Sequence, residues 1–333
     1  MENGIRRQMK NLAICIPTYN RVEVLQDTLS HELEICKELG IDIYLYDSSS
    51  DGKTKELAKR LNEYSNLHHI EIDSSISLDE KVVKLFQSYG REKKHDYFWL
   101  VGDGVIFGEE LLKRVVEVLQ TDPSMVFINN EDLQKLGNKE YDRPKDIFRE
   151  LFWKSSLWGS IIVREDLYYD IDWKTYIDKF VGLDQISIGL HWYRLASVTN
   201  FRAVLLSVRK KIDMRKTSVN KIAWWKEKPC GSETVYRVWA KGLVETAYQL
   251  PFAKEDIEAA LETQRIYAKN FCWINLCRSR KDGVYNLDIY RKYGKQIKIL
   301  SKYPDGLLYC IAITPILLMK VFVRLVDMTK KLR

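Results

Sequence analysis

The sequence predicts an α/β fold: a mostly parallel sheet flanked by helices, followed by a helical C-terminal region. Short apolar runs alternate with helical patterns between residues 12 and 129. Strands that alternate with helices favour a parallel sheet with right-handed crossovers. After about Ser218 the pattern becomes largely helical. A third observation, polar loops after three of the strands, predicts where a ligand binds.

Each predicted strand is a short apolar run that ends in a turn or loop signal. The strands are expected at Leu12–Ile16, Ile41–Tyr46, His69–Ile72, Tyr97–Val101 and Met125–Asn129. Helices with apolar residues at helical spacing are expected between them, at Val22–Leu39, Thr54–Tyr64, Leu78–Tyr89 and Glu109–Leu119. Three later helices are expected at Glu233–Leu250, Lys254–Leu276 and Leu287–Leu300.

The composition is that of a globular protein, but the charge is unevenly distributed. Hydrophobic residues make up 46% and charged residues 30% of the 333 residues. The net charge of +7 combines −8 for residues 1–200 (26 basic, 34 acidic) with +15 for residues 201–333 (27 basic, 12 acidic). A basic C-terminal part indicates an anionic neighbour, such as a membrane surface or an acidic acceptor. No nucleic-acid motif is recognised, and a nucleic-acid partner is not expected.

The N-terminus and the cysteines predict a cytoplasmic protein. MENGIRRQMK has no apolar segment of the kind found in signal peptides. The six cysteines form no CxxC pair, which fits free thiols in a reducing compartment. A peripheral contact at the inner face of the membrane stays open. So does a homo-oligomer.

Three polar loops fall where the first, second and fourth predicted strands end. They are Pro17–Arg21, Asp47–Gly52 and Gly102–Gly104. Parallel α/β sheets bind ligands beyond the carboxyl ends of their strands, so these loops are expected to form one site. The sequence contains neither GxGxxG nor GxxxxGK[ST], which argues against a dinucleotide fingerprint and a P-loop.

At these loops the sequence resembles a known enzyme family. The segments are ICIPTYNR, IDIYLYDSSSDGKTKELAKRL and SLDEKVVKLFQSYGREKKHDYFWLVGDGVIF, within roughly residues 10–210. They resemble the bacterial family 2 glycosyltransferases, which have the GT-A fold. The resemblance implies a GT-A nucleotide-sugar-binding catalytic domain at residues 1–215. Residues 216–333 are then a helical, basic region for contact with an acceptor, a partner or a membrane surface.

The resemblance also implies a donor site at the first two loops. Pro17, Thr18 and Tyr19 would wall the base of the nucleotide. The carboxylate of Asp47 would accept hydrogen bonds from the base or the ribose. The alternative for Asp47 is that it caps the next helix or tightens a turn. Two basic residues complete the predicted donor-binding set, Arg21 and Lys81.

The third loop is the counterpart of the family's metal-binding DxD motif. Asp103 is expected to be catalytic, to contact the donor and to bind Mg²⁺ or Mn²⁺. Val105 occupies the position of the second carboxylate and breaks the motif. Three alternatives follow: a hydrated metal on one carboxylate, lysines or arginines in place of a metal, or a simple turn.

Inverting members of the family use a carboxylate to deprotonate the acceptor hydroxyl. The resemblance assigns this general base to Asp184, with Glu131 and Asp132 as rivals. Asp184 would otherwise be the N-cap of a helix at Gln185–Tyr193. Acceptor contacts are expected from two indoles before the strand Ser160–Val163. These belong to Trp153 and Trp158, for which core packing is the alternative.

The expected function is therefore transfer of a sugar from a nucleoside diphosphate, most often UDP, to a glycan acceptor, with inversion. The donors implied are UDP-glucose, UDP-galactose and UDP-N-acetylglucosamine, and the acceptor is a glycan on a protein or lipid carrier. Val105 leaves a catalytically inactive, glycosyltransferase-like binding or scaffold subunit as the alternative. The apolar run Leu307–Met319 is too short to span a membrane and predicts an interfacial helix or a helix packed on its own domain.

Overall fold

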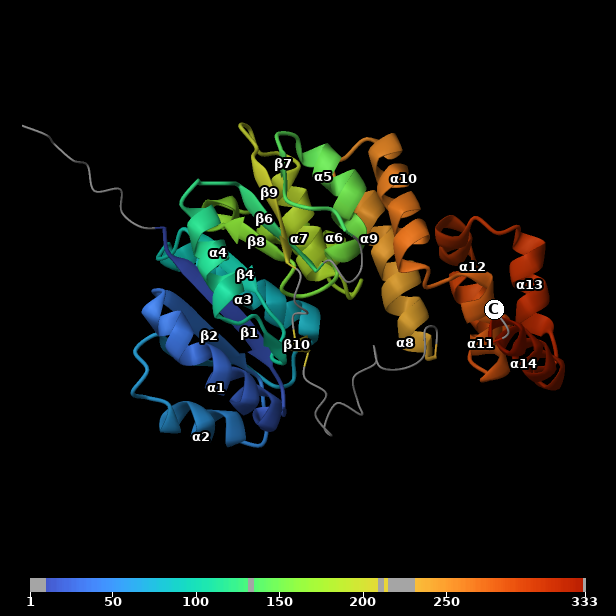
Figure 1. Cartoon of the computed structure of the whole chain (residues 1–333), viewed down its shortest axis with the longest axis horizontal. Coiled ribbons are helices and arrows are strands. Elements are labelled where there is room, and N and C mark those ends of the chain that lie inside the picture. Colours follow the sequence, from blue (N-terminus) through green and yellow to red (C-terminus); the bar gives the residue numbers. More distant parts are fainter. Residues whose placement is uncertain (1–9, 131–134, 209–212, 215–230, 332–333) are drawn as a thin grey trace, which may run out of the picture. The chain divides into compact units, whose positions relative to one another are not determined.

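The computed structural model of the chain describes residues 10–130, 135–208, 213–214 and 231–331 (Figure 1). The chain divides into two compact units. The first comprises Met1–Pro144, Ser155–Ile177 and Tyr193–Val219, and the second comprises Lys145–Lys154, Asp178–Trp192 and Asn220–Arg333. The second unit therefore includes two short segments, 145–154 and 178–192, that precede its main part in the sequence. The functional division at residues 215 and 216, which lie outside the described residues, stays a prediction.

The first unit contains an eight-stranded, mostly parallel sheet, which confirms the predicted α/β class. Its strand order is β3-β2-β1-β4-β8-β6-β9-β7. Strands β7 and β8 run antiparallel to the other six. The strands are β1 (Leu12–Thr18), β2 (Ile41–Asp47), β3 (Leu67–Glu71), β4 (Tyr97–Leu100), β6 (Met125–Asn130), β7 (Lys139–Tyr141), β8 (Ile161–Arg164) and β9 (Ala203–Val208).

Helices cover both faces of this sheet. One face packs on α1 (Val22–Glu38), α2 (Lys53–Arg60) and α4 (Glu109–Leu119), whose apolar residues join those of the strands in one core. The other face packs on α3 (Leu78–Glu92) and the 3₁₀ turn Glu165–Tyr168. Covered faces explain why the strands read as continuous apolar runs.

The register of the sheet brings the first two loops together. Thr18 is the Cα partner of Asp47 in the parallel pair β1–β2. The backbone N–H of Val101, directly after β4, donates to the carbonyl of Cys15 at 2.9 Å. The carboxyl ends of β1, β2 and β4 therefore meet at one edge, as the sequence predicts.

The described part of the second unit is helical. Its helices include α9 (Leu243–Gln249), α10 (Lys254–Thr263), α11 (Trp273–Lys281), α12 (Leu287–Ser301), α13 (Asp305–Ile313) and α14 (Ile316–Lys331). A π-helical turn, Arg237–Gly242, links α8 (Glu233–Tyr236) to α9. A single helix at Lys254–Leu276 is wrong, because the backbone at Lys269 turns left-handed with φ 54° and ends the first helical segment.

The prediction of one helix across Leu307–Met319 is also wrong. The chain bends by 111° between α13 and α14. Thr314 has ψ 131°, an extended value that the residue before a proline prefers, and Pro315 has no N–H to continue the helix. Within the described residues no single helix is long and apolar enough to cross a membrane. Among these residues, only α13 and α14 taken together have the length and apolar composition of a membrane span, and they are bent.

Candidate functional site

Asp103 lies at the centre of the converging loops in the first unit. It is buried, with 7% of its side chain exposed, and its Oδ1 is 2.7 Å from Nη1 of Arg21. The hydroxyl of Thr18 donates to Oδ2 at 3.2 Å. Burial raises the pKa of the Asp103 carboxyl above its usual range, and the Arg21 guanidinium opposes that rise. The structure therefore brings three predicted donor-site residues into direct contact.

Helix α1 fixes the loop that carries Asp103. The hydroxyl of Thr28 donates to the backbone carbonyl of Asp103 at 2.8 Å. A Cβ on Gly104 would lie 3.0 Å from Cγ1 of Val24, which is a very close contact. One turn further along α1, the buried carboxylate of Glu32 accepts from the N–H groups of Phe107 and Gly108, at 2.8 and 3.0 Å. These contacts fix the backbone of the loop after β4 and thereby the position of Asp103.

Asp47 ends β2 and is equally buried. Its Oδ1 accepts from the N–H of Ser49 at 2.8 Å, and its Oδ2 is 3.0 Å from Nε2 of His69. Burial raises the pKa of Asp47, but the bonds to His69 and Ser49 outweigh it and hold the pKa below its usual value. The alternative that Asp47 tightens a turn therefore accounts for Oδ1, which bonds to Ser49, but not for Oδ2, which contacts His69. Gly52, rather than Asp47, is the residue that precedes α2.

His69 is a site residue that the sequence analysis does not single out. It lies in β3 opposite Leu45, two residues before Asp47 on the same face of β2. A polar ring on that face, one strand away from a predicted ligand-binding carboxylate, is the signal that identifies it. Asn20, with φ 50°, is a second such residue. It joins the loops after β1 and β2 through bonds to Ser49 and Ser50 at 2.9 and 3.0 Å.

Tyr19 and Lys81 form a second contact within the predicted donor set. The Tyr19 ring is 50% exposed, and Nζ of Lys81 lies 4.8 Å from its centroid. Partial burial lowers the pKa of Lys81, and the Asp73 carboxylate opposes that change. Pro17 differs from its neighbours because it is buried within β1, so its role beside the base stays a prediction.

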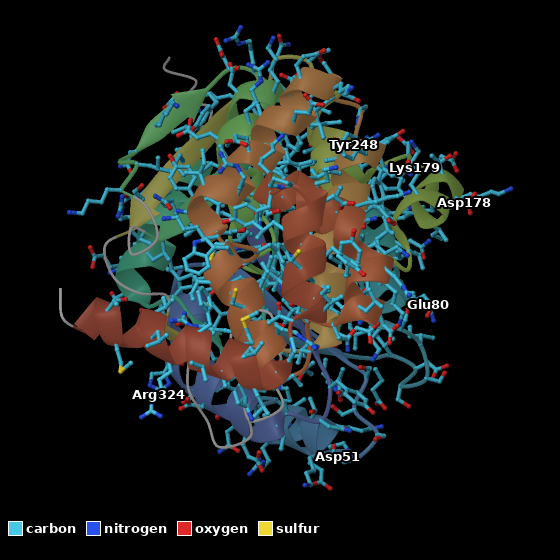
Figure 2. All side chains as sticks on the ribbon, turned by 90° about the vertical axis from the view of Figure 1, so that its right-hand side faces the viewer. Asp51, Glu80, Asp178, Lys179, Tyr248 and Arg324 are labelled. Atoms are coloured by element: carbon cyan, nitrogen blue, oxygen red, sulfur yellow. The ribbon has the colours of Figure 1, made fainter. Side chains whose placement is uncertain are left out.

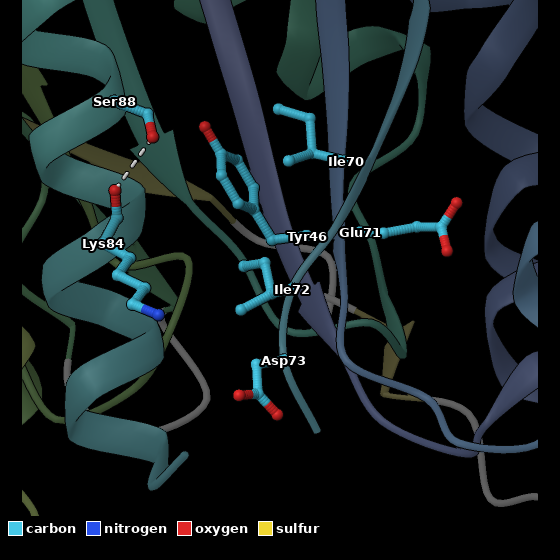
Figure 3. Close-up of a pocket in the computed structure, with 7 residues that line it drawn as sticks. All are labelled: Tyr46, Ile70, Glu71, Ile72, Asp73, Lys84 and Ser88. Atoms are coloured by element: carbon cyan, nitrogen blue, oxygen red, sulfur yellow. Dashed lines mark hydrogen bonds between the residues drawn. The ribbon is translucent and has the colours of Figure 1, made fainter. Parts of the chain in front are cut away.

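A pocket of about 220 Å³ lies between the ends of β2 and β3 and helix α3 (Figure 3). Tyr46, Ile70 and Ile72 line it, and Lys84 and Asp73 add opposite charges. Tyr46 directly precedes Asp47, so the two side chains leave β2 on opposite faces. The pocket is therefore next to the Asp47 strand end, but on the α3 side of the sheet.

The surroundings of Asp103 do not fit a resident metal. Val105 is buried in strand β5 (Val105–Ile106) and belongs to the apolar core, so the second position of the motif points into the protein. The remaining carboxylate already has Arg21 and Thr18 as partners, so a cation here would be held by one carboxylate and would lie beside a guanidinium. Among the described residues, no group of three or more His, Cys, Asp or Glu side chains has the arrangement of a metal site. The observed arrangement at this loop is a carboxylate paired with an arginine.

Asp184, the predicted general base, belongs to the second unit. Its side chain forms an ion pair with Arg237 and is 31% exposed. Its φ of 57° is left-handed, unlike the extended backbone of an N-cap, and helix α7 begins later, at Ile186–Leu195. The neighbouring Gln185 donates to the carbonyl of Val238 at 3.0 Å. The π-helical turn Arg237–Gly242 therefore holds the loop that carries Asp184. Its role stays a prediction, and the rivals Glu131 and Asp132 lie outside the described residues.

The two predicted acceptor tryptophans have different surroundings. Trp153, in the second unit, is 7% exposed and stacks on Tyr267 with ring centroids 5.5 Å apart. This burial fits the core-packing alternative better than an open sugar platform. Trp158, in the first unit, is half-buried just before β8. Acceptor contact at either residue stays a prediction.

Comparison with known proteins identifies the fold. No family model and no curated protein matches the chain. The structure is similar to residues 1–349 of S. aureus TarS in complex with UDP-GlcNAc, with 13% identity, a TM-score of 0.50 and coverage of 89% of this chain and 82% of that one. It is also similar to a longer S. aureus TarS structure (11% identity, TM-score 0.53), covering 87% of this chain and half of that one. A third similar structure is a mannosyltransferase from Pyrobaculum calidifontis in complex with GDP-Man and Mn²⁺ (11% identity, TM-score 0.48, 92% and 87% covered).

These structural neighbours are glycosyltransferases. At 10–13% identity the likeness concerns the fold alone. The chain thus has a glycosyltransferase-like α/β fold, in agreement with the prediction.

Asp47 supplies the first testable prediction. Asp47→Asn should weaken binding of the free nucleotide by about 1–3 kcal/mol, because a carboxylate acceptor is lost from the donor site. Isothermal titration calorimetry with UDP and GDP measures this change. His69→Gln is the matched control, since it removes the imidazole that contacts Asp47 and keeps Asp47 itself. If Asp47→Asn lowers the melting temperature while nucleotide affinity is unchanged, Asp47 serves only the turn and His69.

Proposed function

We propose that this protein is a glycosyltransferase that takes its sugar from a nucleoside diphosphate donor, with UDP as the first candidate. The observation that carries the proposal is the Thr18–Asp103–Arg21 cluster at the carboxyl edge of the parallel strands. A ligand at such an edge meets the loops after several strands at once. The glycosyltransferase-like fold and the motif resemblance over residues 10–210 support the same reading.

Three groups in the loops at this edge, of Tyr19, Asp47 and Arg21, match parts of such a donor. The exposed ring of Tyr19 offers a flat apolar face for a base, and Asp47 offers carboxylate oxygens for base N–H or ribose hydroxyl groups. Arg21, with 27% of its side chain exposed, offers a guanidinium to the diphosphate. Guanidinium groups bind phosphate oxygens in bidentate fashion. Family 2 membership, inversion at the anomeric carbon and a glycan acceptor are further parts of this proposal.

In the proposed reaction the bond between the anomeric carbon and the diphosphate oxygen breaks as the acceptor oxygen attacks. Negative charge develops on the leaving diphosphate, and a fixed cation beside it lowers the barrier. We assign that function to Arg21, which Asp103 holds in place. Asp184 would take the proton from the acceptor hydroxyl.

A thermal-shift screen with UDP-glucose, UDP-galactose, UDP-GlcNAc and GDP-mannose, each with and without Mn²⁺, tests donor binding. A ligand at about 100 times its Kd stabilises the folded state by about 2.7 kcal/mol, which is easily detected. Release of UDP or GDP from the best binder then tests catalysis. If no nucleotide sugar raises the melting temperature, the proposal is wrong. Binding with neither hydrolysis nor transfer would identify a scaffold subunit.

A further inference from the structure

Helices α13 and α14 carry more than half of the exposed large apolar side chains among the described residues. Ten of the 18 exposed large apolar side chains come from these two helices, and Leu317 and Leu318 are 75% and 62% exposed. The remaining eight are distributed over the rest of the described chain. Exposed apolar side chains gathered on one element mark an interaction surface, whereas single ones are ordinary.

The apolar side chains of α14 form a stripe opposite its buried face. Leu317, Val321 and Leu325 follow one another at four-residue spacing, so they share one side of the helix. Met319 and Val323, 4% and 2% exposed, lie on the other side. There α14 is attached to α11 by an ion pair of 2.7 Å between Arg278 and Asp327. The stripe therefore stays uncovered after α14 has packed on its own unit.

Basic side chains border this stripe. Lys320 and Arg324 are also four residues apart, and at 100° per residue they lie between the stripe and the buried face. Both are exposed, and neither pairs with an acidic side chain among the described residues. Figure 2 shows Arg324 extending outward from α14. With Lys281 they line a pocket of about 390 Å³, whose carboxylate, Asp327, is already paired with Arg278.

We propose that the α13–α14 face binds the surface of a membrane that contains anionic phospholipid. The stripe of Leu317, Val321 and Leu325 would enter the boundary between headgroups and acyl chains, while Lys320, Arg324 and Lys281 bind lipid phosphates. Charge complementarity selects this partner, because a purely apolar protein interface would leave two unpaired cations at its border. Spanning is not implied: α14 has 16 residues, or about 24 Å at 1.5 Å per residue, and the hydrocarbon core is about 30 Å thick.

Vesicle co-sedimentation of the full chain tests the proposal. The probes are phosphatidylcholine vesicles with and without about 30% phosphatidylglycerol, and the wild-type chain should bind only the anionic ones. Binding should weaken as salt is raised, since screening shortens the reach of the attraction. The variant Leu317→Gln/Val321→Gln should lose binding. Its control, Ile177→Gln/Ile266→Gln, changes two apolar residues that are 39% and 42% exposed elsewhere and should bind like wild type.

A second pair of variants tests whether binding depends on the basic residues beside the stripe or only on the net charge of the protein. Lys320→Glu/Arg324→Glu should weaken binding on the order of 25-fold or more, because each basic residue near an anionic surface contributes about fivefold. Lys295→Glu/Lys298→Glu, on exposed positions of α12, makes the same change in net charge and should have a much smaller effect. Circular dichroism and nucleotide thermal shifts check that each variant folds and keeps its donor site.

Three results would overturn the proposal. The first is no binding to anionic vesicles at low salt. The second is equal loss in the two charge-reversal variants, which would indicate unspecific attraction. The third is a dimer in light scattering that Leu317→Gln/Val321→Gln converts to a monomer, because the face would then join two copies of this chain. None of these results depends on whether the protein transfers a sugar.

Discussion

Arg21→Met should lower kcat/KM for the nucleotide sugar by about 10²–10³-fold. A fixed donor beside developing negative charge contributes a factor of this size when it is removed. Asp103→Asn should cost less, about tenfold, because its side-chain oxygen still accepts a hydrogen bond while the charge that orients Arg21 is lost. Arg202→Met is the control: Arg202 pairs with Glu140 in the same unit, but it precedes β9 and so lies at the amino end of the parallel strands.

Stability must be measured beside turnover, because Arg21→Met leaves the buried Asp103 carboxylate without its guanidinium. The pKa of Asp103, already raised by burial, should rise further in this variant. A raised pKa in the folded state costs stability where the group is ionised, so the loss should be largest near neutral pH. It should shrink as acidification protonates Asp103. The double variant Arg21→Met/Asp103→Asn should regain the melting temperature and stay inactive.

The opposite ranking would contradict this view of the site. If Asp103 binds a metal during turnover, Asp103→Asn should cost at least as much as Arg21→Met. Raising the Mn²⁺ concentration should then restore part of the activity of Asp103→Asn. Initial rates at several Mn²⁺ concentrations, and in EDTA, distinguish the two outcomes for the wild type and both variants.

The sequence was sufficient for the first part of the fold because each strand there is a separate apolar run between clear loop signals. Strand β9 is also an apolar run, and all six residues of Ala203–Val208 are buried. It was not predicted, because no helical pattern or turn signal marked where it begins and ends. Strand β7 has only three residues, two of them exposed and charged, so pattern alone does not reveal it. The antiparallel direction of β8 depends on how a long connection returns to the sheet, which local patterns do not encode.

The candidate site was predictable in position but not in its pairings. That the loops after β1, β2 and β4 converge follows from the parallel topology alone. The contact between Arg21 and Asp103 depends on side-chain directions, which are set by the backbone dihedral angles of the loop. Asn20, directly before Arg21, has such a decisive angle, because its backbone is left-handed. The loss of the second carboxylate was visible in the letter Val105. The burial of residue 105 in the core, by contrast, became clear only from the packing of β5.

The attachment of Asp184 to the C-terminal helices was equally invisible in the sequence. Arg237 lies 53 residues after its ion-pair partner. The close approach of the two segments depends on Gly242, where a Cβ would lie 2.1 Å from the carbonyl oxygen of Leu183. A glycine inside a predicted helix ordinarily indicates only a small loss of helix propensity. Here it allows the backbone of the Asp184 loop to pack directly on the π-helical turn.

Asp184→Asn should lower the rate of sugar transfer by about 10²–10⁴-fold while donor affinity stays unchanged. Asparagine tolerates the left-handed backbone found at this position, so the loop should keep its shape. Single-turnover transfer at saturating donor measures the chemical step, and calorimetric titration measures the donor affinity.

Two controls test whether the loss belongs to the carboxylate or to its ion pair. Arg237→Gln removes the partner of Asp184 and keeps the predicted base, so its transfer rate should fall far less than that of Asp184→Asn. Asp256→Asn breaks another ion pair of the same unit, that with Arg149, and should change stability only. If Arg237→Gln and Asp184→Asn lose activity and melting temperature equally, Asp184 is a structural partner of Arg237, and the base must be sought elsewhere. A proton acceptor cannot be replaced by its neutral isostere without loss of rate, whereas a purely structural ion pair is broken by removing either partner, and this difference decides between the two roles.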